Sequence, residues 1–139
     1  MYKNILVPTD LADKSERSIL TALDMAAKNL GRVQLVHVVE KMGGEIDDEI
    51  ERFYVTLAKK SDQKLTSWKQ HFQKDFGGVP IEKTILVGKR VQEIIRFCQE
   101  KEIDLIVMTS RTFNEDNQGF GTLSQKVVLF SPVSVLIVC

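Results

Sequence analysis

Residues 3–10 read KNILVPTD, and this short stretch decides the fold. Residues 5–7 form an apolar run that ends at Pro8, Thr9 and Asp10. A strand that is buried on both faces reads as a continuous apolar run, because neither of its faces meets water. The stretch therefore predicts a strand of a sheet covered on both sides, with polar residues where the strand ends.

Helical and strand patterns alternate from this first strand to the end of the chain. Helices are predicted within 15–30, 46–72, 91–98 and 123–130, and strands at 33–39, 81–87, 105–108 and 133–138. Asp13 or Ser15 is expected to cap the first helix, and Gly31 to supply the left-handed residue that ends it. Strands that alternate with helices through short connections require a parallel sheet. We therefore predict an α/β fold, an open five-stranded parallel sheet that is doubly wound and Rossmann-like, with helices on both faces.

Length and composition indicate a single domain, residues 1–139, and exclude several classes of protein. The 19 Lys and Arg residues balance 19 Asp and Glu residues, whereas nucleic-acid-binding proteins usually carry a basic surplus, so no nucleic acid partner is expected. Cys98 and Cys139 lack redox or metal-site spacing. No apolar run approaches the roughly 20 residues that cross a bilayer. We expect a reduced, cytoplasmic protein with no membrane contact.

The helix predicted within 46–72 carries its charges unevenly. Carboxylates gather at 40–52 and lysines between 59 and 74, an order that complements the helix dipole. We interpret these charges as a solvated face, with a docking patch as the alternative. Phe53, Trp68 and Phe72 are expected to pack under the sheet, and a partner surface is the alternative for them too.

Candidate ligand-binding residues lie where the predicted strands end, because ligands of open parallel sheets bind beyond the carboxyl ends of the strands, where the strand order reverses. Asp10 can accept a hydrogen bond from a ribose hydroxyl or a ligand amine, or hold Mg²⁺ through water; the alternative is a turn or helix cap. Gly121 and Thr122 open the last helix, where free N–H groups favour an anion. His37, inside an apolar strand, is expected to be a hydrogen-bonded core residue.

The sequence lacks several motifs that are typical of nucleotide-binding, phosphorylated or catalytic sites. The segment VPTDLADKS after the first strand contains no glycine, so the dinucleotide fingerprint fails there, and the Walker A motif fails as well. A phosphorylation receiver would need an acidic pair where the chain has Asp10 alone and a lysine where it ends in Val138-Cys139. Neither histidine has a nucleophile, an acidic partner or metal-ligand spacing in the sequence. We expect no catalytic residues and no metal site.

Over essentially its whole length the chain resembles the universal stress protein family, the UspA-like α/β domains. The similar segments are YKNILVPTDLADKSERSI at 2–19, LVHVV at 35–39, LVGKRVQEII at 86–95, IDLIVMTSR at 103–111 and SPVSVLIVC at 131–139. The first of them is especially similar to the nucleotide-binding branch of the family. The resemblance implies the same doubly wound fold that the periodicity predicts.

The resemblance also implies where ATP would bind. Members that bind ATP use a Pro-Thr-Asp after the first strand, the backbone at the end of the second, a glycine after the third, and a Gly-x2-Gly-x9-Gly-Ser/Thr signature after the fourth. By position these correspond to Pro8, Thr9, Asp10, Val39, Gly88, Met108, Thr109, Arg111, Thr112, Gly121 and Thr122. Thr109 and Thr112 replace the two leading glycines, and a β-branched side chain hinders close approach of backbone to phosphate. Glu115 and Asp116 would repel a triphosphate unless a divalent cation such as Mg²⁺ intervened.

We therefore expect a cytoplasmic stress-response domain that binds ATP, or another adenine nucleotide, weakly and with little or no hydrolysis. The alternative is a nucleotide-free regulatory module that acts through dimerisation and protein partners. An ATPase is least favoured, because no residue is visibly placed to activate water. Related proteins commonly pair the last strand across a two-fold axis, which implies a homodimer through 133–138, a strand that would be aggregation-prone at an open edge.

Overall fold

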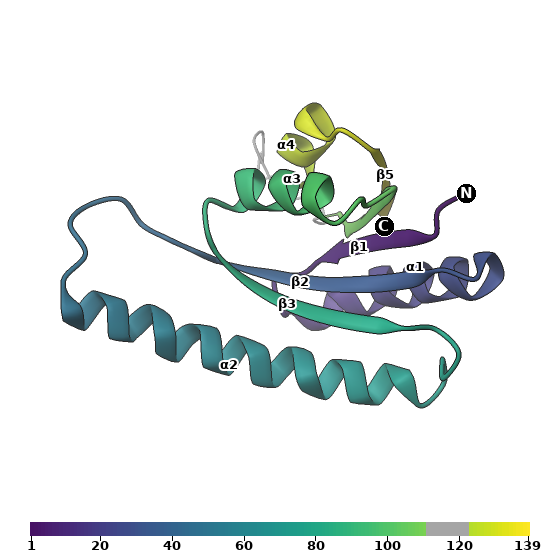
Figure 1. The fold of residues 1–139 in the computed structure, drawn as a ribbon, viewed down its shortest axis with the longest axis horizontal. Helices are drawn as coiled ribbons and strands as arrows, with labels where there is room; N and C mark the ends of the chain where they lie inside the picture. Colours follow the sequence, from purple (N-terminus) through teal and green to yellow (C-terminus); the bar gives the residue numbers. More distant parts are fainter. Residues whose placement is uncertain (111–122) are drawn as a thin grey trace.

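The computed structural model describes residues 1–110 and 123–139 (Figure 1). Five parallel strands form one sheet in the order β3-β2-β1-β4-β5, which confirms the predicted α/β sheet. The strands are β1 (Asn4–Pro8), β2 (Arg32–Glu40), β3 (Ile81–Gly88), β4 (Leu105–Thr109) and β5 (Ser134–Val138). The strand order therefore reverses between β1 and β4, at the middle of the sheet.

Helices cover both faces of the sheet, as predicted (Figure 1). The helices α1 (Glu16–Asn29) and α2 (Asp48–Gln73) pack on one face, and α3 (Arg90–Glu100) and α4 (Leu123–Phe130) pack on the other. Across residues 1–110 and 123–139, no helix is long and apolar enough to span a membrane.

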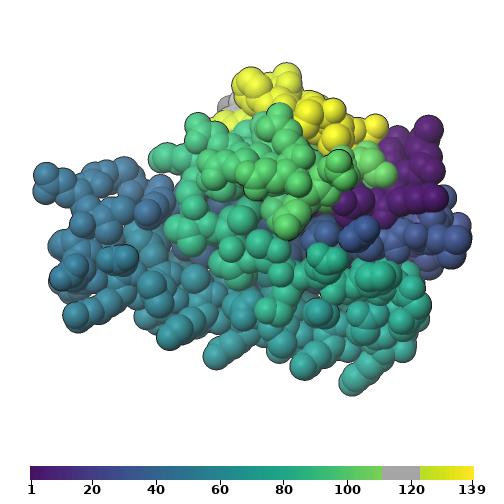
Figure 2. Space-filling view, viewed as in Figure 1, coloured from purple at the N-terminus to yellow at the C-terminus, as the bar shows by residue number. Residues whose placement is uncertain are grey.

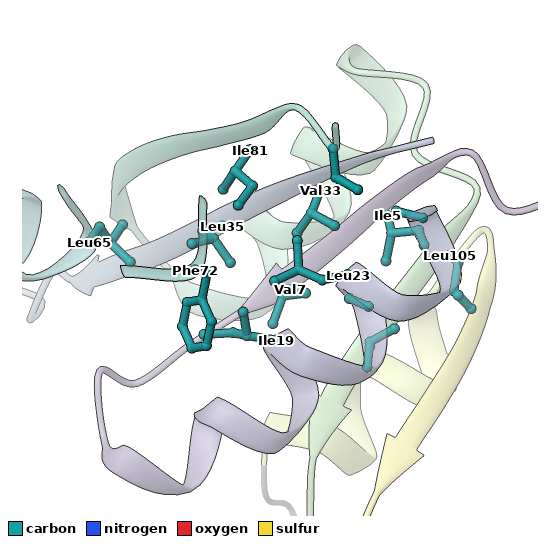
Figure 3. Packing of buried hydrophobic residues seen from close by; sticks show 14 residues of the cluster. Ile5, Val7, Ile19, Leu23, Val33, Leu35, Leu65, Phe72, Ile81 and Leu105 are labelled. Atoms are coloured by element: carbon teal, nitrogen blue, oxygen red, sulfur yellow. The ribbon is translucent and has the colours of Figure 1, made fainter. Parts of the chain in front are cut away.

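The central strand β1 contributes to both halves of the core. Ile5, Leu6 and Val7 are each 0% exposed. Ile5 and Val7 lie in the cluster formed with α1 and α2, where Figure 3 shows them beside Leu23, whereas Leu6 packs in the cluster with Ile94 of α3. Full burial of each such side chain stabilises the fold by about 1.5–3 kcal/mol. The prediction of a strand buried on both faces is confirmed.

The ends of α1 differ from the sequence-based prediction. A 3-10 turn, η1 (Asp13–Ser15), precedes the helix, and the Ser15 side chain makes no capping hydrogen bond. At the other end Leu30, with φ of 56°, adopts the left-handed conformation that was predicted for Gly31. A Cβ on Gly31 would lie 2.6 Å from the carbonyl oxygen of Lys3. Glycine is therefore required there by close backbone packing against β1.

The helix α2 extends beyond the sheet at its N-terminal end (Figure 1). Phe72 is buried and Trp68 packs against the same core cluster, as predicted. Phe53, however, is 61% exposed, so the prediction that it packs under the sheet is wrong. Phe53 lies in the turns of α2 that extend past the strands (Figure 1), and Tyr54 beside it occupies the face that packs inward.

The substitution Gly31→Ala tests the close approach of the α1–β2 connection to β1. The new methyl group meets the Lys3 backbone, which cannot rotate away, so we expect a loss of about 1–3 kcal/mol in the free energy of unfolding. Gly43→Ala is the matched control, because a Cβ there meets nothing within 4 Å, and its effect should stay within about 0.5 kcal/mol. Urea denaturation measures both; equal stability of the two variants would contradict the packing argument.

Candidate functional site

Residues from the ends of β1 and β4 meet at the carboxyl edge of the sheet. Pro8, Thr9 and Asp10 at the end of β1, together with Met108 and Thr109 at the end of β4, line one cavity of about 100 Å³. These two strands are the neighbours between which the strand order reverses. The structure thus brings these five predicted residues together in the crevice where such sheets bind ligands.

Thr9 organises the turn that follows β1. Its backbone N–H donates to the Val36 carbonyl at 2.8 Å, and its hydroxyl donates to Ser15 Oγ at 2.9 Å. The same hydroxyl oxygen accepts from the Leu11 N–H at 2.9 Å. Leu11 has a φ of 67°, a left-handed conformation that costs free energy in a residue other than glycine. The main role of the Thr9 side chain here is to hold this turn.

Asp10 also bonds within the turn, but only through part of its carboxylate. Oδ1 accepts from the Ala12 N–H at 2.9 Å and from the Ser15 hydroxyl at 3.3 Å. Oδ2 lies 3.8 Å from the Lys14 ammonium, and both of these side chains are about half exposed. A carboxylate offers about four acceptor positions. Asp10 is therefore a turn residue that keeps accepting capacity on Oδ2 for a ligand.

The Thr109 hydroxyl is turned toward α1. Its oxygen forms a short contact with the Ser18 hydroxyl, and it also donates to the Lys14 carbonyl at 3.4 Å. Met108 beside it is buried in the core cluster of α3 and α4. Because the Thr109 hydroxyl is already bonded to protein groups, it is poorly placed to donate to a phosphate.

Val39 and Gly88 lie at the same edge of the sheet. They line neither this cavity nor a wider cleft of about 740 Å³ between α3 and α4. Val39 is 2% exposed, so only its backbone is available. Gly88 has a φ of 155°, and a Cβ there would lie 2.8 Å from Glu93 Oε1. Their chain neighbours Glu40 and Lys89 do line the wider cleft. The four remaining predicted site residues, Arg111, Thr112, Gly121 and Thr122, lie outside the described residues.

Arg90 is a site residue that the sequence analysis missed. It lines the cavity of about 100 Å³, a second cavity of about 70 Å³ beside His37, and the wider cleft of about 740 Å³. Its Nε lies 3.2 Å from Glu40 Oε2, which joins the start of α3 to the end of β2. Its position two residues after Gly88, at the carboxyl end of β3, is the signal that could have identified it.

The cleft of about 740 Å³ lies between α3 and α4 and is of a size typical of small-molecule sites, whereas the two smaller cavities are not. Its lining includes the cationic side chains Lys89, Arg90 and Lys126, and the apolar side chains Val91, Ile95 and Phe130. Glu40 is the carboxylate among its described lining residues. Cations concentrated in a cleft attract anions. The arrangement suits an anionic ligand that also has an apolar part.

The described residues offer little for catalysis. His37 Nδ1 lies 2.8 Å from the Thr9 carbonyl, as expected of a hydrogen-bonded core histidine. Burial raises the pKa of the Cys98 thiol to about 11, which keeps it protonated and unreactive near neutral pH. Within 1–110 and 123–139, no three His, Cys, Asp or Glu side chains are grouped to hold a metal ion.

Comparison with known proteins agrees with this fold. The model of the universal stress protein family matches residues 1–138. The chain belongs to the universal stress protein family. One relative, a universal stress protein of Methanocaldococcus jannaschii, is 27% identical over 142 residues, which span 99% of this chain and 82% of the relative.

Solved structures of the family share the fold. UspA from Lactobacillus plantarum is 22% identical with a TM-score of 0.81, over 99% of this chain and 98% of that protein. A universal stress protein from Archaeoglobus fulgidus, solved in complex with dAMP, is 23% identical with a TM-score of 0.71, again over 99% of this chain and 98% of that protein. At these identities the likeness establishes the fold alone.

The two cysteines should differ in reactivity. Cys139 is exposed, whereas Cys98 is buried with its pKa raised to about 11, so iodoacetamide at pH 8 should modify Cys98 much more slowly than Cys139. The folded chain holds this proton more tightly than the unfolded chain. The free energy of unfolding should therefore fall as the pH rises from about 9 toward 11. Mass spectrometry follows the two sites, and equal rates in the native protein would refute the assignment.

Proposed function

We propose that this chain is a cytoplasmic stress-response domain that binds an adenine nucleotide, weakly and without appreciable hydrolysis, in the crevice at the carboxyl edge of the sheet. The observation that carries the proposal is the convergence of Pro8, Thr9, Asp10 and Arg90 at the point where the strand order reverses. The relative from Archaeoglobus fulgidus, which shares the fold, was solved with dAMP. A mononucleotide of this kind combines the apolar base and the anionic phosphate that the crevice suits.

The charges of the crevice favour one direction for the nucleotide. Asp10 keeps an acceptor for a ribose hydroxyl or the base amine, and Arg90, Lys89 and Lys126 attract the phosphate. Side-chain cations can thus offset the loss of the two leading glycines, which Thr109 and Thr112 replace. Flexible lysines lose conformational entropy when they bind, so this solution gives lower affinity than a preformed backbone cradle.

A nucleotide-free regulatory module is the competing function. The observation that favours it is that the Thr109 hydroxyl, at the position of a signature glycine, is already bonded to Ser18 and the Lys14 carbonyl. Isothermal titration with AMP, dAMP and ATP, each with and without Mg²⁺, decides between the two. Heat with any of them supports nucleotide binding, and its absence with all of them leaves the regulatory module.

Arg90→Gln should weaken binding of AMP and ATP about tenfold, because one charge-assisted contact to phosphate is worth about 1.5 kcal/mol. Binding of adenosine, which lacks phosphate, should change much less. Arg96→Gln is the control on the same helix, since Arg96 pairs with Glu93 and lines neither of the two cavities nor the wider cleft. Equal losses in the two variants, or an equal loss for adenosine, would contradict the assigned direction.

We also propose that the chain forms a homodimer through β5. This strand lies at the edge of the sheet and pairs with β4 on its other side. Next to it in sequence, α4 exposes three apolar side chains, Val128 (52%), Leu129 (76%) and Phe130 (65%). An open edge strand with apolar side chains beside it is a surface that pairs with another copy unless something blocks it.

Leu136→Glu tests this dimer. Leu136 is 37% exposed in β5, so the charge should oppose pairing of the edge across a two-fold axis, and circular dichroism checks that the variant stays folded. We expect the weight-average mass in sedimentation to fall relative to the wild type at micromolar concentration. Leu20→Glu, at a 40% exposed position of α1, is the control and should leave the mass unchanged. A wild-type mass of 15.8 kDa at every concentration would reject the dimer.

A further inference from the structure

The N-terminal half of α2 presents an apolar stripe to solvent. Ile50, Phe53 and Leu57 are spaced three and four residues apart, so they lie on one face of the helix, and they are 38%, 61% and 37% exposed. Ile46, just before the helix, is 45% exposed. A different face of α2, with Tyr54, packs inward. The exposed stripe is therefore additional to the side chains that hold α2 on the sheet.

The described part of the chain leaves this stripe uncovered. The first turns of α2 extend past the ends of the strands in Figure 1, and the segment around 45–55 projects at one end of the molecule in Figure 2. Apolar side chains that share one exposed helix face can form an interaction site.

Charged residues continue the same face at both ends of the stripe. Glu49 lies four residues before Phe53, and Lys60 and Lys64 lie seven and eleven residues after it, all at helical spacing. Lys64 lies over the Trp68 ring, 5.7 Å from its centroid. Among the ion pairs of the described residues, neither Glu49 nor Lys60 takes part. Along the helix the face therefore reads acidic, apolar, basic.

We propose that this face binds the same face of a second copy of the chain, with the two α2 helices antiparallel around a two-fold axis near Phe53. The apolar stripes then cover each other. Glu49 of each copy lies within three residues, about 4.5 Å along the axis, of the level of Lys60 in the other, which a lysine side chain spans. A face that is acidic at one end and basic at the other is complementary to itself only in this antiparallel arrangement.

This contact overlaps neither the proposed nucleotide site nor the proposed β5 dimer. The helix α2 packs chiefly against β3 at one edge of the sheet, and β5 forms the other edge. One copy can therefore make both contacts at once. Two different isologous contacts on one chain build either a closed tetramer or an open polymer, whereas each contact alone builds a dimer.

Cysteine cross-linking tests the position of the axis. In a Cys139→Ser background, Phe53→Cys should form a disulfide-linked dimer in the presence of oxidised glutathione, because the axis brings residue 53 of one copy beside residue 53 of the other. Lys59→Cys is the control, since residue 59 is exposed but lies about 120° from residue 53 around the same helix. The Phe53→Cys cross-link should persist when Leu136→Glu is added. Equal cross-linking at positions 53 and 59 would overturn the proposal.

Charge reversal tests the pairing. Glu49→Lys and Lys60→Glu should each weaken self-association about tenfold, because each places like charges together, and the double variant should restore it. Phe53→Glu should lower the weight-average mass further, and sedimentation measures all four proteins. Circular dichroism confirms that α2 remains folded. An unchanged mass for Phe53→Glu, or no recovery in the double variant, would refute antiparallel pairing.

Discussion

Burial of β1 on both faces is the constraint on which the rest of the structure depends. Three consecutive side chains, Ile5, Leu6 and Val7, point alternately to opposite faces, and each is completely removed from water. This requires a helical layer on each side and a strand on each edge, which β2 and β4 provide. The strand order has to reverse beside such a central strand. The polar residues that end it, Thr9 and Asp10, consequently line the crevice.

Most of the fold could be predicted from sequence patterns that span only a few residues. The run at 5–7 and the helical spacing of apolar residues gave the elements, and strand ends gave five residues of the crevice. The predictions that were wrong depended on contacts between distant segments. Gly31 is needed because Lys3 lies against it, and Phe53 is exposed because the first turns of α2 extend past the strands. Neither the close approach of Lys3 to Gly31 nor the place where the sheet ends can be predicted from local sequence.

The position of the site could be predicted from the sequence, but the hydrogen bonds and ion pairs of its residues could not. Ser18 meets Thr109 across 91 residues of sequence, and this contact changes the hydroxyl from a free donor to a group bonded within the protein. Arg90 lines both cavities and the wider cleft, because β3 ends beside β2. There Arg90 pairs with Glu40. Sequence position alone could mark Arg90 as a residue near the crevice. Only the packed structure shows that it is the cation shared by all three.

Although the net charge is zero, the crevice and the exposed face of α2 differ in character. The short segment between β2 and α2 connects these two surfaces. Glu40, at the end of β2, pairs with Arg90 in the crevice at 3.2 Å. Two residues further on, the Met42 N–H donates to the Tyr54 hydroxyl of α2 at 2.8 Å. A phosphate that competes with Glu40 for Arg90 therefore acts on the strand end from which this connection starts. Any effect of a bound nucleotide on the exposed face of α2 has a direct covalent route, and that route is anchored at both ends by polar contacts.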